Sequence, residues 1–497
     1  MGIKLKNIGL IVLGMVAGVI GSMQFDAVAQ HSTGSPLPVE EMRKLSYVFG
    51  LIKSDYVEPV DDRKLLDDAI SGMVSSLDPH SAYLDKTAFK ELHESIEGKF
   101  VGLGIEVGME DGYVHVISPI EDSPAYHAGI KAGDLISHLD GEPVRGLSLE
   151  EAVKKMRGEV DTKITLTIIR KGEEKPLIVP IVRKEIQTQS VKAKVVEPGY
   201  AWLRVSQFQE PTVSDLAKKL STIYAQDPNL KGLVLDLRND PGGVLPGAIG
   251  VSAAFLPKDA VIVSTKGQIP ASNMTYYASE AYATRTVGDQ LLKLPEAVKN
   301  VKMVVLVNTG SASASEIVAG ALQDYKRAAI MGSKTFGKGS VQTIQNLSDD
   351  TAVKLTTARY YTPNDRSIQA KGIVPDLLVD EYADGDGMNE FRMRESDLQK
   401  HLTNDKDKSA NASTKPKVDE MEEEMRAAAQ EKKRKPLEYG IKDDFQLAQA
   451  LNYLKDKQVQ LSKDSADAGK PSVAETKPST PAKSAASAKP VAPAEKK

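Results

Sequence analysis

The sequence contains no cysteine, and tryptophan occurs only once among its 497 residues. Without cysteine the protein has no thiol nucleophile, no disulfide and no zinc–thiolate site. The formal net charge of −4 gives no basic excess, so nucleic acid is not an expected partner. We expect neither a metal nor a cofactor. Hydrophobic residues make up 41% of the composition, enough for the cores of the two or three domains that this length predicts.

Histidine is also scarce, with seven residues in the chain and none between positions 139 and 400. A nucleophile in that central span therefore needs a base other than a local histidine. His80, in the segment "SLDPHSAYL", could approach the span through folding. Its turn-like surroundings favour a structural role over a catalytic one.

The first 29 residues have the pattern of a signal peptide. Lys4 and Lys6 precede an apolar stretch at 7–25, and Ala27-Val28-Ala29 forms an A-x-A cleavage site. We expect cleavage after Ala29 and export to a bacterial periplasm. Because the apolar stretch approaches the length of a membrane span, a retained inner-membrane anchor is the alternative.

Two amphipathic patterns flank the central part of the chain. The N-terminal pattern places on one helical face Met42, Leu45, Val48, Phe49 and Ile52. The C-terminal pattern does the same with Phe445, Ala448, Leu451 and Leu454. Such helical arms pack on their own core or form a dimer interface. The last segment, 463–497, consists mainly of Ala, Pro, Ser and Lys and is expected to be disordered.

Residues 98–183 have the pattern of a small β-rich module. Short strands are expected at 101–107, 114–117, 135–139 and 164–169, with one helix at 148–156. The segments "GKFVGLGIEV" and "SPAYHAGIKAGDLISHLDGEPV" resemble a PDZ domain. The resemblance implies that Leu103, Gly104 and Ile105 form the loop whose N–H groups bind a peptide's C-terminal carboxylate. The peptide then adds a strand to the sheet.

The segment "VVLVNTGSASASEIVAGAL", 304–322, places three serines between a buried-strand pattern and a helix pattern. A residue at such a turn is exposed beside the free N–H groups of the helix, a favourable place for a nucleophile. The serines could equally be helix caps. A candidate base follows in "MGSKTFGKGSVQ", where glycines and apolar neighbours surround Lys338. Burial would lower the pKa of this lysine from about 10.4 towards neutrality, as a general base requires.

The combination of "GLVLDLRNDPGG", "NTGSASASEI" and "KTFGKGSVQ" resembles the carboxy-terminal processing proteases, the S41 family of Ser–Lys endopeptidases. "GYAWLRVSQF" and "KLTTARYYTPNDRSIQAKGIVPD" extend the resemblance over about residues 38–380. It implies that Ser313 is the nucleophile, Lys338 the general base, and Gln342 the residue that orients the lysine. Arg157, in "KKMRGEV", matches the position that couples the PDZ domain to the protease core.

The turn "DLRNDPGG" is the expected source of an oxyanion-hole donor. The N–H of Gly242 or Gly243 would act together with that of Ala314. An ordinary β-turn without a catalytic role would have the same sequence. Two positions depart from the family pattern: Asp240 stands where Asn is common, and Ala370 where Gly is frequent. The segment 267–290 is longer than usual and could be a lid, a partner surface or a plain insertion.

The predicted fold is a multidomain α+β protein, a crotonase- and ClpP-like α/β core with an inserted PDZ domain and helical arms. Its expected divisions are a signal peptide at 1–29, a helical region at 38–97 that also contributes to the core, the PDZ domain at 98–183, the protease core at 190–380, a polar and helical segment at 381–462, and the tail at 463–497.

The expected function is a periplasmic serine endopeptidase that binds substrate C-termini through its PDZ domain and processes or degrades exported proteins. By resemblance, its partners are a second copy or larger homo-oligomer and a tetratricopeptide-repeat lipoprotein adaptor, and cell-wall hydrolases are among its substrates. Two other classes stay open: a non-catalytic PDZ adaptor, and an acyl-CoA enzyme of crotonase-like fold.

Overall fold

The computed structural model describes residues 38–120, 122–279, 291, 293–385, 392–408 and 437–462. The expected signal peptide, residues 386–391 and 409–436 of the expected polar and helical segment, and the expected disordered tail lie outside these residues. The chain divides into two compact units, residues 1–74 and 75–497. Within the described ranges, no helix combines the length and the apolar character needed to cross a membrane.

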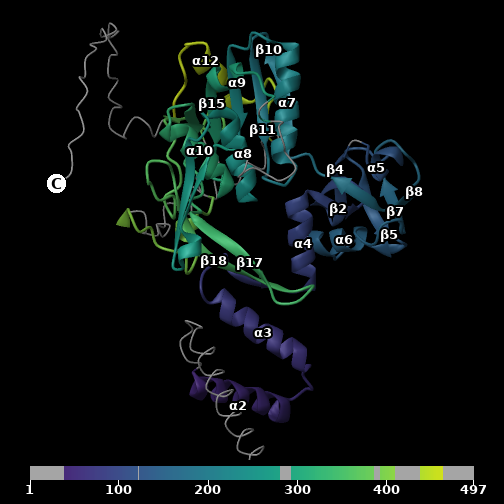
Figure 1. The fold of residues 1–497 in the computed structure, drawn as a ribbon. Coiled ribbons are helices and arrows are strands. Elements are labelled where there is room, and N and C mark those ends of the chain that lie inside the picture. Colours follow the sequence, from purple (N-terminus) through teal and green to yellow (C-terminus); the bar gives the residue numbers. More distant parts are fainter. Residues whose placement is uncertain are drawn as a thin grey trace, which may run out of the picture. The chain divides into compact units, whose positions relative to one another are not determined.

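The first unit consists of helices α2 (Val39–Asp55) and α3 (Asp62–Ser75), drawn in purple in Figure 1. Helix α2 contains the predicted N-terminal stripe, yet none of its residues is buried. Met42, Leu45 and Val48 are about half exposed on this helix. Phe49 and Ile52 of the stripe are partly buried, and within the described residues of this unit the stripe has no buried core to pack on.

The second unit is built around a six-stranded sheet. Its strands, in spatial order, are β10 (Val191–Glu197), β11 (Tyr200–Val205), β12 (Gly232–Asp236), β15 (Lys302–Val307), β16 (Ala329–Gly332) and β19 (Leu377–Leu378). All neighbours are parallel except β10 and β11. Such a sheet must be covered on both faces, which explains the continuous apolar runs in its central strands.

Helices cover the two faces of this sheet unequally (Figure 1). On one face pack the crossover helices α7 (Thr212–Gln226), α8 (Leu245–Phe255) and α10 (Ala314–Asp324). On the other face packs α12 (Phe445–Leu454), the predicted C-terminal stripe. Successive residues of β12 alternate between these cores, with Leu233 and Leu235 facing α7, α8 and α10, and Val234 facing α12.

A second, antiparallel sheet carries the segments that follow Lys338. Its strands are β1 (Ala82–Leu84), β13 (Val261–Gly267), β14 (Met274–Tyr277), β17 (Ser340–Asn346) and β18 (Ala352–Tyr361). Strand β14 lies in the long segment 267–290, whose described part ends at residue 279. This part of the segment is therefore an edge strand of the sheet.

The β-rich module forms its own sheet and core, inserted after helix α4 (Lys86–Glu97). Its elements are β3 (Ile105–Glu110), β4 (Tyr113–Pro119), α5 (Pro124–His127), β5 (Leu135–Leu139), β6 (Glu142–Pro143), α6 (Leu149–Met156), β7 (Lys163–Ile169) and β8 (Leu177–Val182). Strands β2 (Lys99–Gly102) and β9 (Lys184–Gln187) pair at its two ends and close the insertion.

One expected strand of this module is divided in two. The sequence predicted a single strand at 101–107, whereas β2 ends at Gly102 and β3 begins at Ile105. Between them Gly104 has φ +75°, and a Cβ there would lie 2.2 Å from Ser123 Cβ. The chain turns here because glycine tolerates both the positive φ and the close packing.

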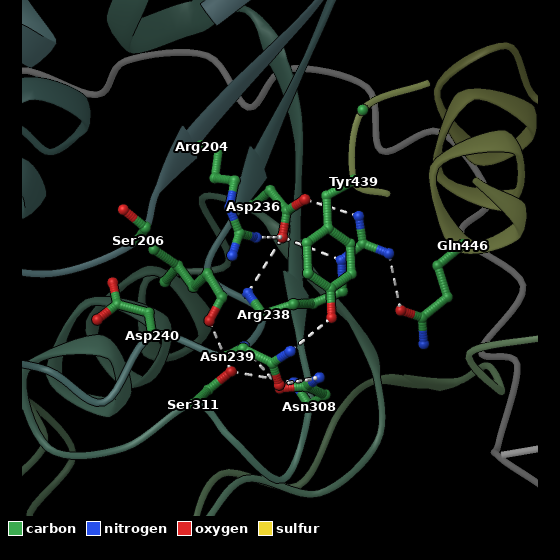
Figure 2. Close-up of polar contacts among 12 residues, drawn as sticks. Arg204, Ser206, Asp236, Arg238, Asn239, Asp240, Asn308, Ser311, Tyr439 and Gln446 are labelled. Atoms are coloured by element: carbon green, nitrogen blue, oxygen red, sulfur yellow. Dashed lines mark hydrogen bonds and ion pairs between the residues drawn. The ribbon is translucent and has the colours of Figure 1, made fainter. Parts of the chain in front are cut away.

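A fully buried arginine joins the C-terminal helix to the central sheet (Figure 2). The Arg238 guanidinium lies 2.6 Å from a carboxylate oxygen of Asp236, which ends β12, and 2.6 Å from one of Asp444, the N-cap of α12. The Tyr439 ring lies 4.2 Å from the guanidinium carbon. Removing one partner of such a buried pair costs about 3–5 kcal/mol. This ion pair therefore fixes α12 and also the start of the turn after β12.

Candidate active site

Two turns meet at the carboxyl ends of neighbouring parallel strands. The turn 237–243 follows β12 and the turn 308–313 follows β15, and these strands pair in register. The carboxyl edge of a parallel sheet is where α/β proteins place their sites. Asn308 holds the turns together, because its side-chain amide donates to Asn239 at 2.9 Å and its oxygen accepts the Asn239 N–H at 2.9 Å.

The three serines of the turn have different roles. The Ser311 hydroxyl donates to the Leu237 carbonyl at 2.8 Å, and the Ser315 hydroxyl donates to the Asp240 carbonyl at 2.8 Å. Both serines are fully buried and connect the two turns. Ser313 is partly exposed, and its hydroxyl donates to no backbone carbonyl of the described chain. The structure thus separates the candidate nucleophile from two structural serines.

The backbone of Ser313 has an unusual conformation at the start of α10. Its φ is 55° and its ψ −114°, a positive φ that non-glycine residues rarely adopt and that concentrates at functional sites. The Gly242 backbone packs against it, since a Cβ at Gly242 would lie 2.8 Å from Ser313 Cβ. The nucleophile candidate therefore stands at a strained strand-to-helix turn, with the Pro-Gly-Gly turn directly beside it.

Lys338 lies in the loop between β16 and β17, half-buried, as the sequence predicted from its apolar and glycine neighbours. Burial lowers the pKa of this amine, and the positive charge of Lys354 lowers it further. The direction is the one that a lysine base needs. No hydrogen bond joins the Lys338 amine to the Ser313 hydroxyl among the described residues.

Glu316 fixes the nucleophile turn and the lysine loop to each other. It is fully buried on the first turn of α10. One carboxylate oxygen accepts the N–H groups of Ser313, at 2.8 Å, and Lys338, at 2.9 Å. The other accepts the Thr335 hydroxyl at 2.6 Å and the Gly337 N–H at 2.7 Å. Burial raises the pKa of Glu316 to about 7, while these four donors favour its ionised form.

Tyr360 on β18 completes this link. Its hydroxyl donates to the Lys338 carbonyl, and its ring is buried. Burial raises the pKa of the phenol well above its usual value and the Glu316 charge adds to the rise, whereas a hydrogen bond with Ser313 acts in the opposite direction. Tyr360 therefore remains a neutral donor next to both candidate catalytic residues.

Gln342, the predicted orienting residue, lies on β17 beside the lysine loop. Its amide nitrogen donates to Ser340 at 3.0 Å and to Thr356 at 3.1 Å. No hydrogen bond from its side chain reaches Lys338 in the described chain. The Gln342 carbonyl oxygen accepts from no described donor, so it remains available to the lysine amine.

His80, expected to be structural, belongs to a chain of buried polar groups that reaches the lysine loop. Its Nε2 lies 2.7 Å from Glu395, whose other oxygen accepts the Gln369 amide at 2.8 Å. The Gln369 oxygen in turn accepts the Gly339 N–H at 3.0 Å, next to Lys338. His80 thus supports the loop through two residues, Glu395 and Gln369, and has no hydrogen bond with Ser313 in the described chain.

The backbone donors expected to form an oxyanion hole are not equivalent. The Gly242 N–H already donates to the Asp240 carboxyl at 2.8 Å. The N–H groups of Gly243 and Ala314 donate to no acceptor among the described residues. Gly243 has φ 144°, and a Cβ there would lie 2.0 Å from the Phe208 carbonyl oxygen. Of the two glycines, Gly243 is therefore the better candidate.

Ala370, where the sequence departs from the family pattern, has φ 57°. This left-handed conformation costs an L-residue about 1–2 kcal/mol, which explains why glycine is favoured there. Its N–H donates to the Gly337 carbonyl at 2.8 Å. The strain is thus located directly against the lysine loop.

The predicted peptide-binding loop of the PDZ module borders a cavity of about 150 Å³. The Leu103 and Gly104 carbonyls point inward, accepting the N–H groups of Ala125 at 3.0 Å and Ile120 at 2.8 Å. The N–H groups of Leu103 and Gly104 donate to no described acceptor. Ile105 begins β3, the edge strand of this sheet. The loop therefore offers free donors at the end of an open strand edge, the arrangement that binds a C-terminal carboxylate.

Arg157 follows α6 and lines the same cavity. Its guanidinium donates to Glu94 of α4 at 2.8 Å and lies 5.3 Å from the centre of the Phe100 ring. A single side chain therefore contacts both the peptide groove and the helix that precedes the module.

Sequence reasoning missed Glu316 and Glu395 as parts of the site. The motif letters S-A-S-E contain Glu316, and its position on the first helical turn was read as part of the helix pattern. Nothing in the sequence linked Glu395 to Lys338, because the two are distant in the chain and only the fold brings Glu395 to the lysine loop, through Gln369 and through its own N–H to the Phe336 carbonyl.

Comparisons with known proteins agree with this architecture. A model described as peptidase family S41 matches residues 199–379, a PDZ-domain model matches 115–170, and a model described as the activating protease CtpB N-terminal domain matches 17–88. A carboxy-terminal-processing protease of Bartonella bacilliformis is 46% identical over 374 residues, which cover 74% of this chain and 82% of the relative. A probable CtpA-like serine protease of Staphylococcus aureus is 36% identical, covering 74% and 70%.

Among solved structures, a photosystem II D1 C-terminal processing protease is 30% identical and covers 68% of this chain and 86% of its own, with a TM-score of 0.40. The matches to curated relatives show that the protein is a serine peptidase with a PDZ domain. More specifically, it belongs to the S41 family as a carboxy-terminal-processing protease. This confirms the family, the fold class and the enzyme class that the sequence motifs predicted.

The buried Glu316 makes stability depend on pH. Its pKa is raised in the folded state from 4.5 to about 7, so the folded protein binds more protons than the unfolded chain between these values. The free energy of unfolding should therefore decrease by about 3 kcal/mol as the pH rises from 4.5 to 7. Denaturant unfolding across this range should show a decrease that is about 3 kcal/mol smaller in Glu316→Gln than in the native protein. The exposed Glu91→Gln should match the native protein; an equal decrease in Glu316→Gln and the native protein would contradict the assignment.

Proposed function

We propose that the peptidase uses Ser313 as nucleophile and Lys338 as general base, with Gln342 orienting the lysine amine. The observation that carries this proposal is that the hydroxyls of the two neighbouring serines are already hydrogen-bonded to backbone carbonyls. Ser311 and Ser315 are tied to carbonyls, whereas Ser313 stands strained beside the Pro-Gly-Gly turn, opposite a lysine whose pKa burial lowers.

The proposed reaction begins when the Ser313 oxygen adds to the scissile carbonyl carbon and the Lys338 amine takes the hydroxyl proton. The carbonyl oxygen becomes negative and receives hydrogen bonds from the N–H groups of Gly243 and Ala314. The lysine then gives the proton to the leaving amine, and water hydrolyses the acyl-enzyme by the reverse sequence.

The catalytic assignment is tested with the purified native protein and Ser313→Ala, each incubated with casein. We expect cleavage by the native protein only, and loss of at least about 10³-fold in Ser313→Ala and Lys338→Ala, because both remove a member of one catalytic unit. The exposed Lys258→Ala is the matched lysine control and should cleave normally. Equal cleavage by Ser313→Ala would exclude this nucleophile.

We propose further that substrates bind by their C-termini in the PDZ groove and that Arg157 couples this groove to the protease core. The support is its double contact, with the groove and with Glu94 of α4. The Ser313 and Lys338 side chains are not hydrogen-bonded to each other in this structure. We propose that a peptide bound in the PDZ groove favours the conformation in which they are.

Replacing Arg157 by alanine should lower kcat/KM for a protein substrate about tenfold, the size of a 1.4 kcal/mol coupling. A peptide too short to reach the PDZ groove should be cleaved by Arg157→Ala at the same rate as by the native protein, when no PDZ ligand is present. Lys154→Ala, an exposed cation of the same helix, is the control. Unchanged turnover of the protein substrate by Arg157→Ala would contradict the proposed coupling.

A second copy of the chain is the proposed partner of helix α2. Its apolar stripe is exposed in the described chain, and burial of Met42, Leu45 and Val48 against an equivalent stripe would remove that area from water. Sedimentation velocity should give a homodimer or larger assembly for the native protein and Lys44→Gln, and a monomer for Leu45→Gln. A native monomer at micromolar concentration would contradict this.

Export to the periplasm is proposed from the signal-peptide pattern at residues 1–29. Exported proteins, cell-wall hydrolases among them, are the proposed substrates, delivered by a tetratricopeptide-repeat lipoprotein adaptor. N-terminal sequencing of protein from the periplasmic fraction should begin at Gln30. Recovery only from the cytoplasm, or an intact Met1 in the membrane fraction, would contradict cleavage and soluble export.

A further inference from the structure

Asp240, in the turn beside the candidate nucleophile, has a carboxyl group with only one hydrogen bond. Its side chain is fully buried. One oxygen accepts the Gly242 N–H at 2.8 Å, and the other is buried with no hydrogen-bond partner in the described chain. An ionised carboxylate removed from water needs several donors or a cation, and a single N–H does not compensate its charge.

The charged groups around Asp240 leave no cation for it. Arg204 of β11 acts on it from one side, but its guanidinium already lies 3.2 Å from Asp236 of β12. Arg238 is likewise held between Asp236 and Asp444. Burial raises the pKa of Asp240 well above its usual value and the nearby charge of Asp236 adds to the rise, although the Gly242 N–H, the Ser315 hydroxyl and Arg204 act in the opposite direction.

The third element packed against Asp240 is the nucleophile turn with the start of α10. From it the Ala312 N–H, at 2.9 Å, and the Ser315 hydroxyl, at 2.8 Å, both donate to the Asp240 backbone carbonyl. These two residues flank Ser313. The charged group of this helix turn is Glu316, an acid whose oxygens are occupied by other donors, so it supplies no positive charge to Asp240.

Asp240 therefore connects three parts of the site. Its carbonyl binds both sides of the Ser313 turn, and its carboxyl binds the Gly242 N–H. A Cβ at Gly242 would lie 2.9 Å from the Ala314 nitrogen, one of the proposed oxyanion donors. A charge on this carboxyl would consequently lie beside the oxygen that becomes negative during the reaction.

We propose that Asp240 is a positioning residue that acts as a neutral carboxylic acid: protonated, it holds the Pro-Gly-Gly turn against Ser313, and its ionisation inhibits the enzyme. The inhibition is electrostatic, because the negative carboxylate opposes the negative oxygen of the tetrahedral intermediate in a site of low dielectric. This inference rests on the proposed catalytic role of Ser313, and it predicts an upper pH limit for the peptidase activity.

The test compares kcat against pH, from 6 to 10.5, for the native protein and the near-isosteric Asp240→Asn. In the native protein kcat should fall about tenfold per pH unit above the pKa of Asp240. Asp240→Asn should reach the native maximum within a few-fold and lack this alkaline decrease, while its acid limb stays unchanged. The exposed Asp349→Asn should match the native protein at every pH. The same alkaline decrease in Asp240→Asn would overturn the proposal.

A second readout does not require activity. A pKa raised in the folded state makes the free energy of unfolding fall with rising pH up to that pKa. Above about pH 8, where Glu316 no longer contributes to the slope, the native protein should still lose stability, and Asp240→Asn should not. Identical slopes would overturn the proposal even if peptidase activity is absent. A slope difference without Ser313-dependent cleavage would uphold the neutral acid and instead refute the proposed catalytic function.

Discussion

The carboxylate of Glu316 is the constraint on which the rest of the site depends. It lies inside the protein, takes two donors on each oxygen, and in doing so holds the N–H of Ser313 and the N–H of Lys338 on the same atom. Two loops that are 25 residues apart are thereby fixed through one group. Their backbones are held rigidly while the Ser313 and Lys338 side chains remain separate, so adjustment for catalysis falls to the side chains and to the elements that carry them.

Three buried acids near the same sheet edge show how surroundings decide the state of a carboxyl group. Asp236 is paired with Arg238 and Arg204, and although burial opposes ionisation these cations lower its pKa. Glu316 has four donors and no cation, and its pKa rises to about 7. Asp240 accepts one backbone N–H, and burial raises its pKa well above its usual value.

The PDZ module is attached through short, well-defined connections. Strands β2 and β9 pair at the entrance and exit of the insertion, and Arg157 reaches from the peptide groove to Glu94 on the preceding helix. A ligand in the groove can therefore act on α4 through the ion pair of Arg157 with Glu94, and on β2 through the contact of Arg157 with the Phe100 ring. Such a connection suits regulation better than a large apolar interface, because a few contacts can be broken and remade at small free-energy differences.

The sequence by itself determined the family and the order of domains through the resemblance of its motifs, and it located the candidate nucleophile turn through a local pattern: an apolar strand, a small-residue turn and a helix. It also indicated Ala370 as a departure, although only the backbone showed its positive φ. The tertiary structure decided which serine hydroxyls bond backbone carbonyls, which glycine N–H is already occupied, and which acids are paired with a cation. Those facts depend on contacts between residues far apart in the chain, such as Arg238 with Asp444 and Glu316 with Gly337, and burial then sets the protonation of each group.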